Sequence, residues 1–201
     1  MSDPSAGAAA ACRQELLALL SPGASAGPTR SQPNQQSRVQ QLIETLEQQT
    51  PADLQRDAAA LTGVWELRWS SSSLPYLTVA PWLENLQLLD PERGRAMNLL
   101  RLQGPLGPVA GIAVQAAIAL LPAEAERPAQ RVSVRFEQGG WLGPRLPGGP
   151  RLQLLRRVNQ SFPAWLDITV LDSDLRVCRG NAGTLFALLR RDDLPLEAFF
   201  S

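Results

Sequence analysis

The sequence contains no histidine and no lysine, so all nineteen of its basic residues are arginines. Without histidine there is no imidazole general base, no Ser–His or Cys–His dyad, and no histidine-ligated zinc or haem. Without lysine there is no Schiff base and no phosphate-loop lysine. These absences exclude much of enzyme chemistry, and we expect the protein not to be an enzyme.

The sequence has only two cysteines and no net charge. Cys12 and Cys178 are far apart and lack metal-ligand spacing, so we interpret both as free thiols in a reducing compartment. The nineteen acidic residues balance the nineteen arginines, which leaves no long-range basic field. Nucleic acid is therefore a poor candidate partner, and no motif calls for a metal or a resident cofactor.

Targeting and membrane-spanning patterns are missing as well. The first basic residue, Arg13, follows the acidic Asp3, which is the wrong order for a secretory signal. The longest mostly apolar run, Val109 to Leu121, is shorter than the roughly 20 residues that a spanning helix needs. We expect a monomer that is cytoplasmic or peripherally attached to a membrane.

Helical patterns are confined to residues 1–60. Residues 10–20 predict one short helix, and 51–60 predict another. Between them an apolar stripe at i, i+3, i+4 and i+7 predicts an amphipathic helix, formed by Val39, Leu42, Ile43 and Leu46. Residues 21–35 are rich in Ser, Pro, Gly, Asn and Gln, which is typical of a flexible linker.

From residue 61 the apolar period changes to two, which is typical of strands. Trp65, Leu67 and Trp69 alternate with polar residues and predict a strand with these three side chains on one face. Similar patterns predict eight or nine strands, at 64–70, 86–89, 96–102, 112–120, 132–136, 152–158, 165–171, 175–178 and 184–190, with a Gly/Pro-rich loop at 138–150.

This spacing indicates a mainly β fold. Strands so close together, with no helical pattern between them, favour antiparallel pairing, and an up-and-down β-barrel over 61–191 removes exposed edges. About eight strands leave an interior that side chains fill or that holds one small ligand. The C-terminal tail, 192–201, contains the apolar segment Leu194–Phe200, which either docks on the barrel or acts as a partner motif.

Three stretches carry a family resemblance. They lie in the N-terminal helices, at the first strand and at the end of the barrel: Gln14–Leu17 with Val39–Glu47, Leu61–Ser72, and Trp165–Asp167 with Leu171–Asn181 and Gly183–Leu188. In this order they resemble the plastid lipid-associated protein family, also called plant fibrillins, the last stretch almost residue for residue. The use of arginine in place of every lysine resembles a cyanobacterial member from a GC-rich genome.

The resemblance implies a lipocalin-like barrel that binds or sequesters hydrophobic isoprenoids or lipids, of the carotenoid or quinone class, at photosynthetic membranes such as the thylakoid. The expected partner is then a hydrophobic small molecule, with peripheral membrane contact as an open addition. The alternative is a structural or interaction protein on the thylakoid or lipid-globule surface, whose barrel is filled by its own side chains.

The resemblance also implies a structural signature, formed by Gly63, Trp65, Asp172, Asp174, Arg176, Arg179, Gly180 and Gly183. In lipocalin-like barrels the tryptophan seals the closed end and an arginine of the last strands packs over its ring; Arg176 or Arg179 is the candidate. Asp172 and Asp174 favour a turn with Asp–Arg pairing at the rim, against a cation site or a ligand headgroup contact. An arginine that points inward has to be paired, because an unpaired buried charge is very costly.

Eight residues are candidate ligand contacts. Six belong to predicted strands and either line a cavity or fill the core: Trp65, Leu67, Trp69, Val114, Val134 and Phe136. Tyr76 and Trp82 lie between strands, where they either cover the barrel mouth or dip into a membrane interface. The strand at 112–120 is rich in alanine, which leaves more room on whichever face turns inward.

Overall fold

The structure is a computed structural model that describes residues 4–21, 33–72, 79–80, 82–105, 111–124 and 129–200. Three helices come first: α1 (Pro4–Leu20), α2 (Pro33–Gln49) and α3 (Leu54–Leu61). Across these described ranges the chain then forms nine strands: β1 (Gly63–Ser70), β2 (Leu83–Asp90), β3 (Arg95–Leu102), β4 (Gly111–Leu120), β5 (Arg131–Arg145), β6 (Arg151–Arg157), β7 (Ala164–Leu171), β8 (Leu175–Gly180) and β9 (Leu185–Arg190).

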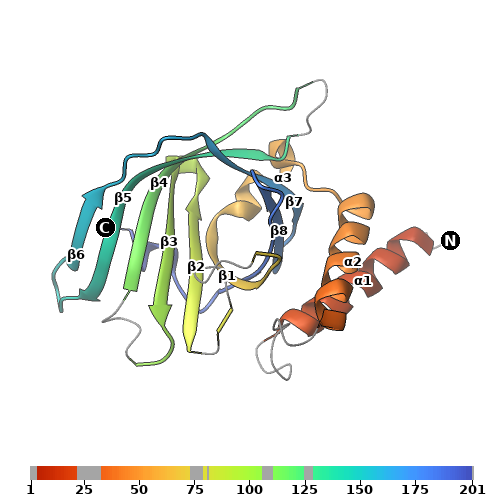
Figure 1. Cartoon of the computed structure of the whole chain (residues 1–201), viewed down its shortest axis with the longest axis horizontal. Coiled ribbons are helices and arrows are strands. Elements are labelled where there is room, and N and C mark those ends of the chain that lie inside the picture. The colour runs from red at the N-terminus through yellow and green to blue at the C-terminus, as the bar shows by residue number, and fades with distance from the viewer. Residues whose placement is uncertain are drawn as a thin grey trace.

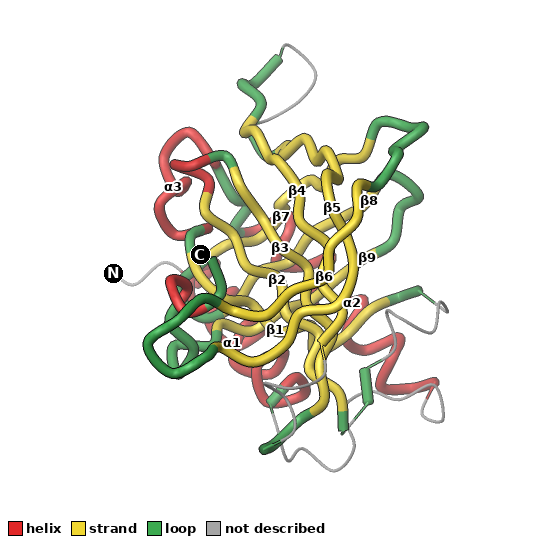
Figure 2. Tube along the Cα trace, turned by 90° about the vertical axis from the view of Figure 1, so that its left-hand side faces the viewer, coloured by secondary structure: helices red, strands yellow, loops and turns green. Residues whose placement is uncertain are grey.

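The strands close into an antiparallel barrel (Figure 1). Their order is β4-β3-β2-β1-β9-β8-β7-β5-β6, and an additional pairing of β4 with β5 closes a ring of eight among the described strands. The ninth strand, β6, pairs with β5 outside the ring. Figure 2, turned so that the β6 side faces the viewer, shows the strands crossing in front of much of α1 and α2, with α3 beside them. The predicted lipocalin-like, mainly β barrel with N-terminal helices is confirmed.

β5 is the strand that completes the ring. Its last part pairs with β6, whereas its first part pairs with β7 through a short ladder, from Arg131 opposite Asp167 to Val134 opposite Ala164. Where this ladder ends, Gln160 takes over its hydrogen bonds. The Oε1 atom of Gln160 accepts from the backbone N–H of Phe136 at 2.6 Å. The seam between β5 and β7 is therefore short.

The predicted loop at 138–150 is wrong over its first part, which belongs to β5. The strand continues to Arg145, because Gly140 lets β6 approach closely: a Cβ atom there would lie 2.1 Å from the carbonyl oxygen of Leu154. The φ of Gly140 is +155°, which L side chains rarely adopt. Gly140 therefore allows β5 and β6 to pair, although glycine in a sequence is usually taken to indicate a loop.

A β-bulge divides the side chains of β1 between two faces. The pairing register with β9 shifts between Leu67 and Trp69. Trp65 and Leu67 point into the barrel core, whereas Trp69 is buried between the sheet and the N-terminal helices, where its Nε1–H donates to Gln36 Oε1 at 2.8 Å. The predicted common face for Trp65, Leu67 and Trp69 is wrong, because a bulge reverses the direction of the residue that follows it.

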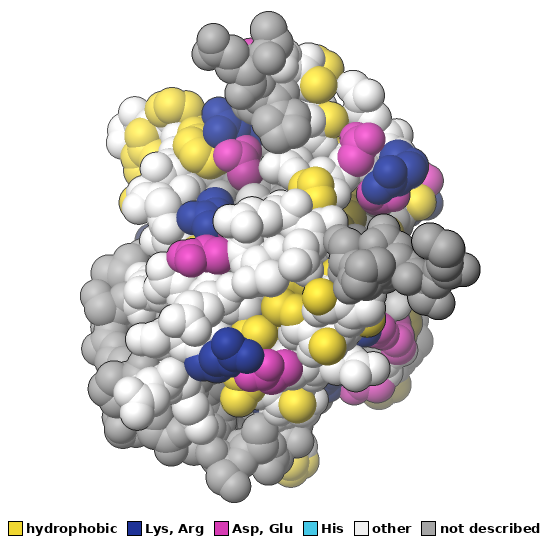
Figure 3. All heavy atoms as spheres, turned by 90° about the vertical axis from the view of Figure 1, so that its right-hand side faces the viewer, with side chains coloured by type: hydrophobic (Ala, Val, Ile, Leu, Met, Phe, Trp, Pro, Cys, Tyr) yellow, Lys and Arg dark blue, Asp and Glu magenta, His cyan; other side chains and the backbone are white. Residues whose placement is uncertain are grey.

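The helices α1 and α2 cover the flank of the barrel near β7 and β8 (Figure 1). The predicted stripe of α2 is buried with Leu16 and Leu20 of α1 against the outward residues of β7, β8 and β9. On this side of the molecule basic and acidic side chains lie next to each other (Figure 3), as in the pair of Arg38 with Glu15. None of the described helices combines the length and the apolar character that crossing a bilayer requires.

The predicted linker at 21–35 is too long at its end. Residues 22–32 lie outside the described residues, and α2 already begins at Pro33. Proline suits the first turn of a helix, because its missing N–H would have no partner there. The helical pattern therefore extends back into a segment whose composition is typical of a loop.

The C-terminal tail docks on the barrel. Phe199 is buried together with Leu88, Met97 and Leu99, whose side chains point away from the barrel interior. The helical turn Leu196–Ala198 brings it there. Of the two uses considered for the tail, docking is therefore the one that the structure shows.

Candidate functional site

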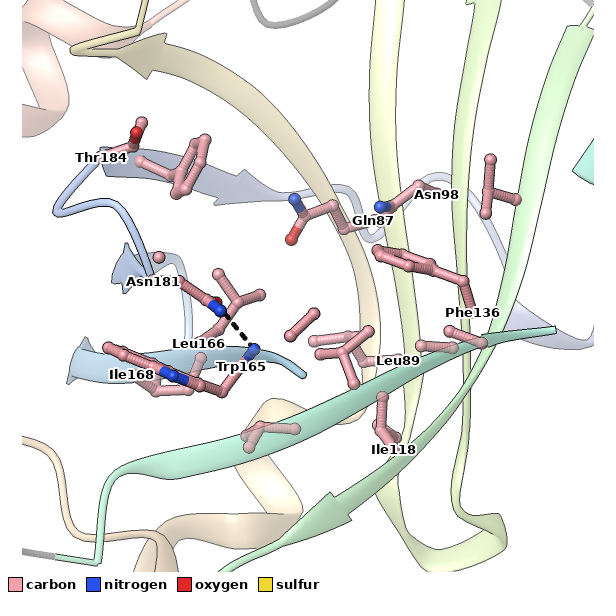
Figure 4. Close-up of a pocket in the computed structure, with 18 of the residues that line it drawn as sticks. Gln87, Leu89, Asn98, Ile118, Phe136, Trp165, Leu166, Ile168, Asn181 and Thr184 are labelled. Carbon is pink, nitrogen blue, oxygen red and sulfur yellow. Dashed lines mark hydrogen bonds between the residues drawn. The ribbon is translucent and has the colours of Figure 1, made fainter. Parts of the chain in front are cut away.

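The barrel encloses a cavity of about 410 Å³, which lies at the lower end of the roughly 300–1,000 Å³ usual for small-molecule sites. Figure 4 shows its lining on two facing walls. Trp165, Leu166, Ile168, Asn181 and Thr184 come from the wall around β7–β9. The other wall belongs to β2–β5 and contributes Gln87, Leu89, Asn98, Ile118 and Phe136. Most of the lining is apolar.

The polar groups of the lining are few. Gln87 of β2 is buried and pairs in register with Asn98 of β3, which in turn lies opposite Val114 of β4. Arg176 of β8 is fully buried and donates from Nη2 to Oε1 of Gln87. A few polar groups in an apolar pocket are what fixes the orientation of a small ligand.

The closed end of the barrel is built around Trp65. Its Nε1–H donates to the carbonyl oxygen of Leu61, the last residue of α3, at 3.0 Å. Two guanidinium groups contact the ring: the Cζ atom of Arg176 lies 5.3 Å from the ring centroid and that of Arg190 lies 4.3 Å away. Of the two predicted arginines, Arg176 occupies this place, and Arg179 instead pairs with Glu47 of α2.

Gly63 is shaped by the same arrangement. Its φ is +141°, and a Cβ atom there would lie 2.5 Å from Nη1 of Arg190. Glycine thus leaves room for the arginine that packs on the tryptophan two residues later. The contact with Arg190 therefore explains why glycine stands two residues before the tryptophan at the closed end of the barrel.

Asp172 and Asp174 form a turn held by α1. The Oδ1 atom of Asp172 accepts from the backbone N–H groups of Asp174 and Leu175 at 2.8 and 2.9 Å, and Arg13 donates to both carboxylates at 2.6–2.9 Å. Burial alone would raise the pKa of Asp172, but these hydrogen bonds outweigh it and hold that pKa below its ordinary value. The predicted turn with an Asp–Arg pair is present, but the partner is Arg13 of α1 and not Arg176 or Arg179, the two arginines of the predicted cluster.

The hairpin between β8 and β9 contains the two signature glycines. The backbone N–H of Gly180 donates to the carbonyl oxygen of Thr184 at 2.9 Å, and Gly183 has a φ of +75°, in the left-handed region that favours glycine. Gly180 also lines the cavity. Among the residues that the structure describes, no group of three or more Cys, Asp or Glu side chains is placed to hold a metal ion.

The cavity opens to solvent at four exposed lining residues, which we call the mouth: Asn98, Phe162, Asn181 and Ala182. Asn181 braces one side, since its Oδ1 accepts from the backbone N–H of Trp165 at 2.9 Å (Figure 4). Next to it, Gln160 donates from its Nε2 to the carbonyl oxygen of Phe162 at 2.6 Å. Phe162 is 61% exposed, so an apolar ring stands at the opening.

Most of the chain resembles one known family. The PAP_fibrillin family model matches residues 11–189, from α1 to the last strand. The chain belongs to the PAP_fibrillin family. A comparison with the curated proteins finds no match.

In this PAP_fibrillin protein the predicted ligand contacts fall into separate places. Val114, Val134 and Phe136 line the cavity. Trp65 and Leu67 belong to the barrel core but not to the cavity lining.

The three remaining candidates lie elsewhere. Trp69 is on the helix side of the sheet. Trp82 is 65% exposed just before β2 and does not line the cavity. Tyr76 falls outside the described residues.

Several lining residues of this PAP_fibrillin chain were not singled out in the sequence. Gln87 stands in an apolar strand, and its place between Leu86 and Leu88 marks a polar side chain on the face opposite to theirs. Trp165 was placed in a predicted strand and in a stretch that carries the family resemblance, but not among the ligand contacts. It lines the cavity and stacks on Arg131, whose Cζ is 3.7 Å from its ring centroid. Phe162 lies in a connection that carried no strand pattern.

Proposed function

We propose that this protein is a non-catalytic binder of one hydrophobic isoprenoid or lipid molecule, of the carotenoid or quinone class, held inside the barrel. The observation that carries this proposal is the cavity of about 410 Å³ with its mainly apolar lining, in a barrel of the PAP_fibrillin family. Removal of apolar ligand surface from water would drive binding, at about 25 cal/mol per Å².

Two exposed aromatic side chains support uptake of the ligand from an apolar phase. Phe162 stands exposed beside the opening, and Trp82 is exposed at the start of β2. Tryptophan favours the interface between membrane and water. We propose peripheral contact with a photosynthetic membrane, with the protein acting as a monomer that takes up or releases its ligand there.

The test is to purify the protein from a pigmented photosynthetic host and to extract it with organic solvent. We expect a co-purifying isoprenoid or lipid, and quenching of tryptophan fluorescence when a quinone with a ten-carbon chain is added to the stripped protein. Because Trp165 lines the cavity, Trp165→Phe should remove most of the quenching and keep the binding that calorimetry measures. An empty extract together with no binding of quinone or carotenoid rejects the proposal.

The alternative, a scaffold with a filled barrel, requires side chains to occupy the interior. The cavity counts against this filled interior. A scaffold role would show itself as flotation with vesicles, or as capture of a partner protein, that is independent of any ligand.

A further inference from the structure

Arg176 carries a charge into the interior of the barrel. Along β8 the side chains of Leu175 and Val177 are buried against α1 and α2, whereas those of Arg176 and Cys178 point the other way, into the barrel. The side chain of Arg176 is fully buried and lines the cavity. Burial, and to a smaller extent the neighbouring Arg190, lowers the pKa of Arg176 to about 10, so the guanidinium is still charged at neutral pH.

The guanidinium of Arg176 is only partly satisfied. Its Nη2 donates to Gln87, and its Cζ atom lies over the ring of Trp65, 5.3 Å from the centroid. Its Nε and Nη1 groups have no hydrogen-bond acceptor among the described residues, and no described carboxylate forms an ion pair with it. Arg13, Arg131 and Arg179, by contrast, each pair with a carboxylate.

An unpaired buried cation is costly, so a complementary group is expected where Arg176 meets the cavity. A neutral carbonyl oxygen would accept one hydrogen bond but would leave the charge uncompensated beside a second cation, Arg190. A phosphate monoester has three acceptor oxygens, whereas Arg176 offers only two groups without an acceptor, Nε and Nη1. A carboxylate carries one charge and has lone pairs for several N–H donors.

We propose that the ligand is a single-chain amphiphile with a carboxylate headgroup, which accepts hydrogen bonds from Arg176 while its apolar chain runs through the cavity toward the mouth. This inference rests on the proposed function and narrows its ligand to an acidic lipid or acidic isoprenoid. Gln87 keeps the guanidinium in place, and its amide N–H₂ is a further donor next to the headgroup site. Val114, Ile118 and Ile168 line the cavity and offer apolar surface to the chain.

The test compares palmitate with its uncharged methyl ester, each titrated into the full chain and followed by calorimetry. Since hydrogen bonds to charged groups contribute about 1.5–3 kcal/mol, palmitate should bind about ten- to a hundredfold more tightly than the ester. Arg176→Met should reduce the affinity for palmitate to that for the ester and leave ester binding unchanged. Arg179→Met is the matched control: it removes an arginine of the same strand that pairs with Glu47 outside the cavity, and should keep the wild-type ratio.

The outcomes separate this inference from the proposed function. Equal affinities of the wild-type protein for acid and ester overturn the carboxylate site, and so does binding of a quinone or carotenoid without binding of palmitate; the proposed function stands in both cases. Absence of binding by palmitate, ester, quinone and carotenoid overturns both. If Arg176→Met does not fold, the comparison of acid with ester on the wild-type protein decides by itself.

Discussion

Arg190 lies over the ring of Trp65, with its Cζ atom 4.3 Å from the ring centroid. The same guanidinium donates to the carbonyl oxygens of Ala60 and Thr62, at the C-terminal end of α3. Cations at this end of a helix are favoured by its unpaired carbonyl groups. One side chain therefore joins the last strand, the first strand and the helix that covers the closed end of the barrel.

Replacing Arg190 should destabilise the closed end. Arg190→Met removes the ring contact and the hydrogen bonds to α3, and we expect it to lower the free energy of unfolding by about 2–3 kcal/mol. Urea denaturation measures this loss. Arg135→Met is the control, because Arg135 is 74% exposed and its pair with Glu137 should contribute little. Equal losses in the two variants would contradict the role of Arg190.

Filling the cavity should block ligand binding without unfolding the barrel. Val114→Phe adds a ring to the lining at mid-strand in β4, and we expect the affinity for a hydrophobic ligand to fall at least about tenfold, because overlap with the ligand cannot be relieved in a packed core. The control, Ile112→Phe, changes a residue of the same strand that is 63% exposed and does not line the cavity. Unchanged binding by Val114→Phe would place the ligand elsewhere.

The Asp172 turn should make stability depend on pH in a defined direction. Its folded-state pKa lies below the ordinary value, so its contribution is present above about pH 4, the usual unfolded pKa, and is lost as pH falls through the folded one. Asp172→Asn keeps the turn but removes the charge that Arg13 meets. We expect it to cost about 1–2 kcal/mol at pH 7, a difference that shrinks below pH 4 in denaturation series.

The exposed pair of Arg135 and Glu137 is the control for this series. Glu137→Gln should change stability by less than about 0.5 kcal/mol at any pH, because exposed ion pairs are screened by solvent. A constant difference between wild type and Asp172→Asn from pH 7 to pH 3 would show that the charge of Asp172 is not what stabilises the turn.

Gly140 should be intolerant of any side chain. Gly140→Ala places a Cβ atom against the carbonyl oxygen of Leu154, so we expect β6 to separate from β5 and its amides to exchange rapidly with deuterium. Gly148→Ala tests backbone strain alone, since Gly148 has a φ of +66° and open space around it. Its cost should be only about 1 kcal/mol, with β6 exchange unchanged. Equal protection of β6 in both variants would refute the steric argument.

Much of the fold follows from local patterns. The stripe of α2 and the alternation in β4 and in the first part of β1 depend on nearest neighbours in sequence, so periodicity alone predicts them. The alternation fails at Trp69, because the bulge before it is set by pairing with β9, more than a hundred residues later. The strand within 138–145 is missed for a similar reason, since Gly140 serves the approach of a distant strand.

The candidate site was only partly predictable. Val114, Val134 and Phe136 were placed inward by their strand period, and they do line the cavity. The partners of charged residues were not predictable, because pairs such as Arg13 with Asp172 are 159 residues apart in the sequence. Trp65 is part of the closed end of the barrel and not a ligand contact. This follows from the packing of α3 against it and not from any pattern in β1.

The short seam between β5 and β7 has a consequence for the motion of the molecule. The ladder that joins Arg131–Val134 to β7 has fewer backbone pairs than the ladder that joins β5 to β4, and Val134 at its end borders the cavity. Local opening requires the least free energy where the fewest hydrogen bonds break. We expect β5 and β7 to separate locally at Val134 and Ala164. This opening would let a bulky ligand enter or leave while the other strand pairs of the barrel stay intact.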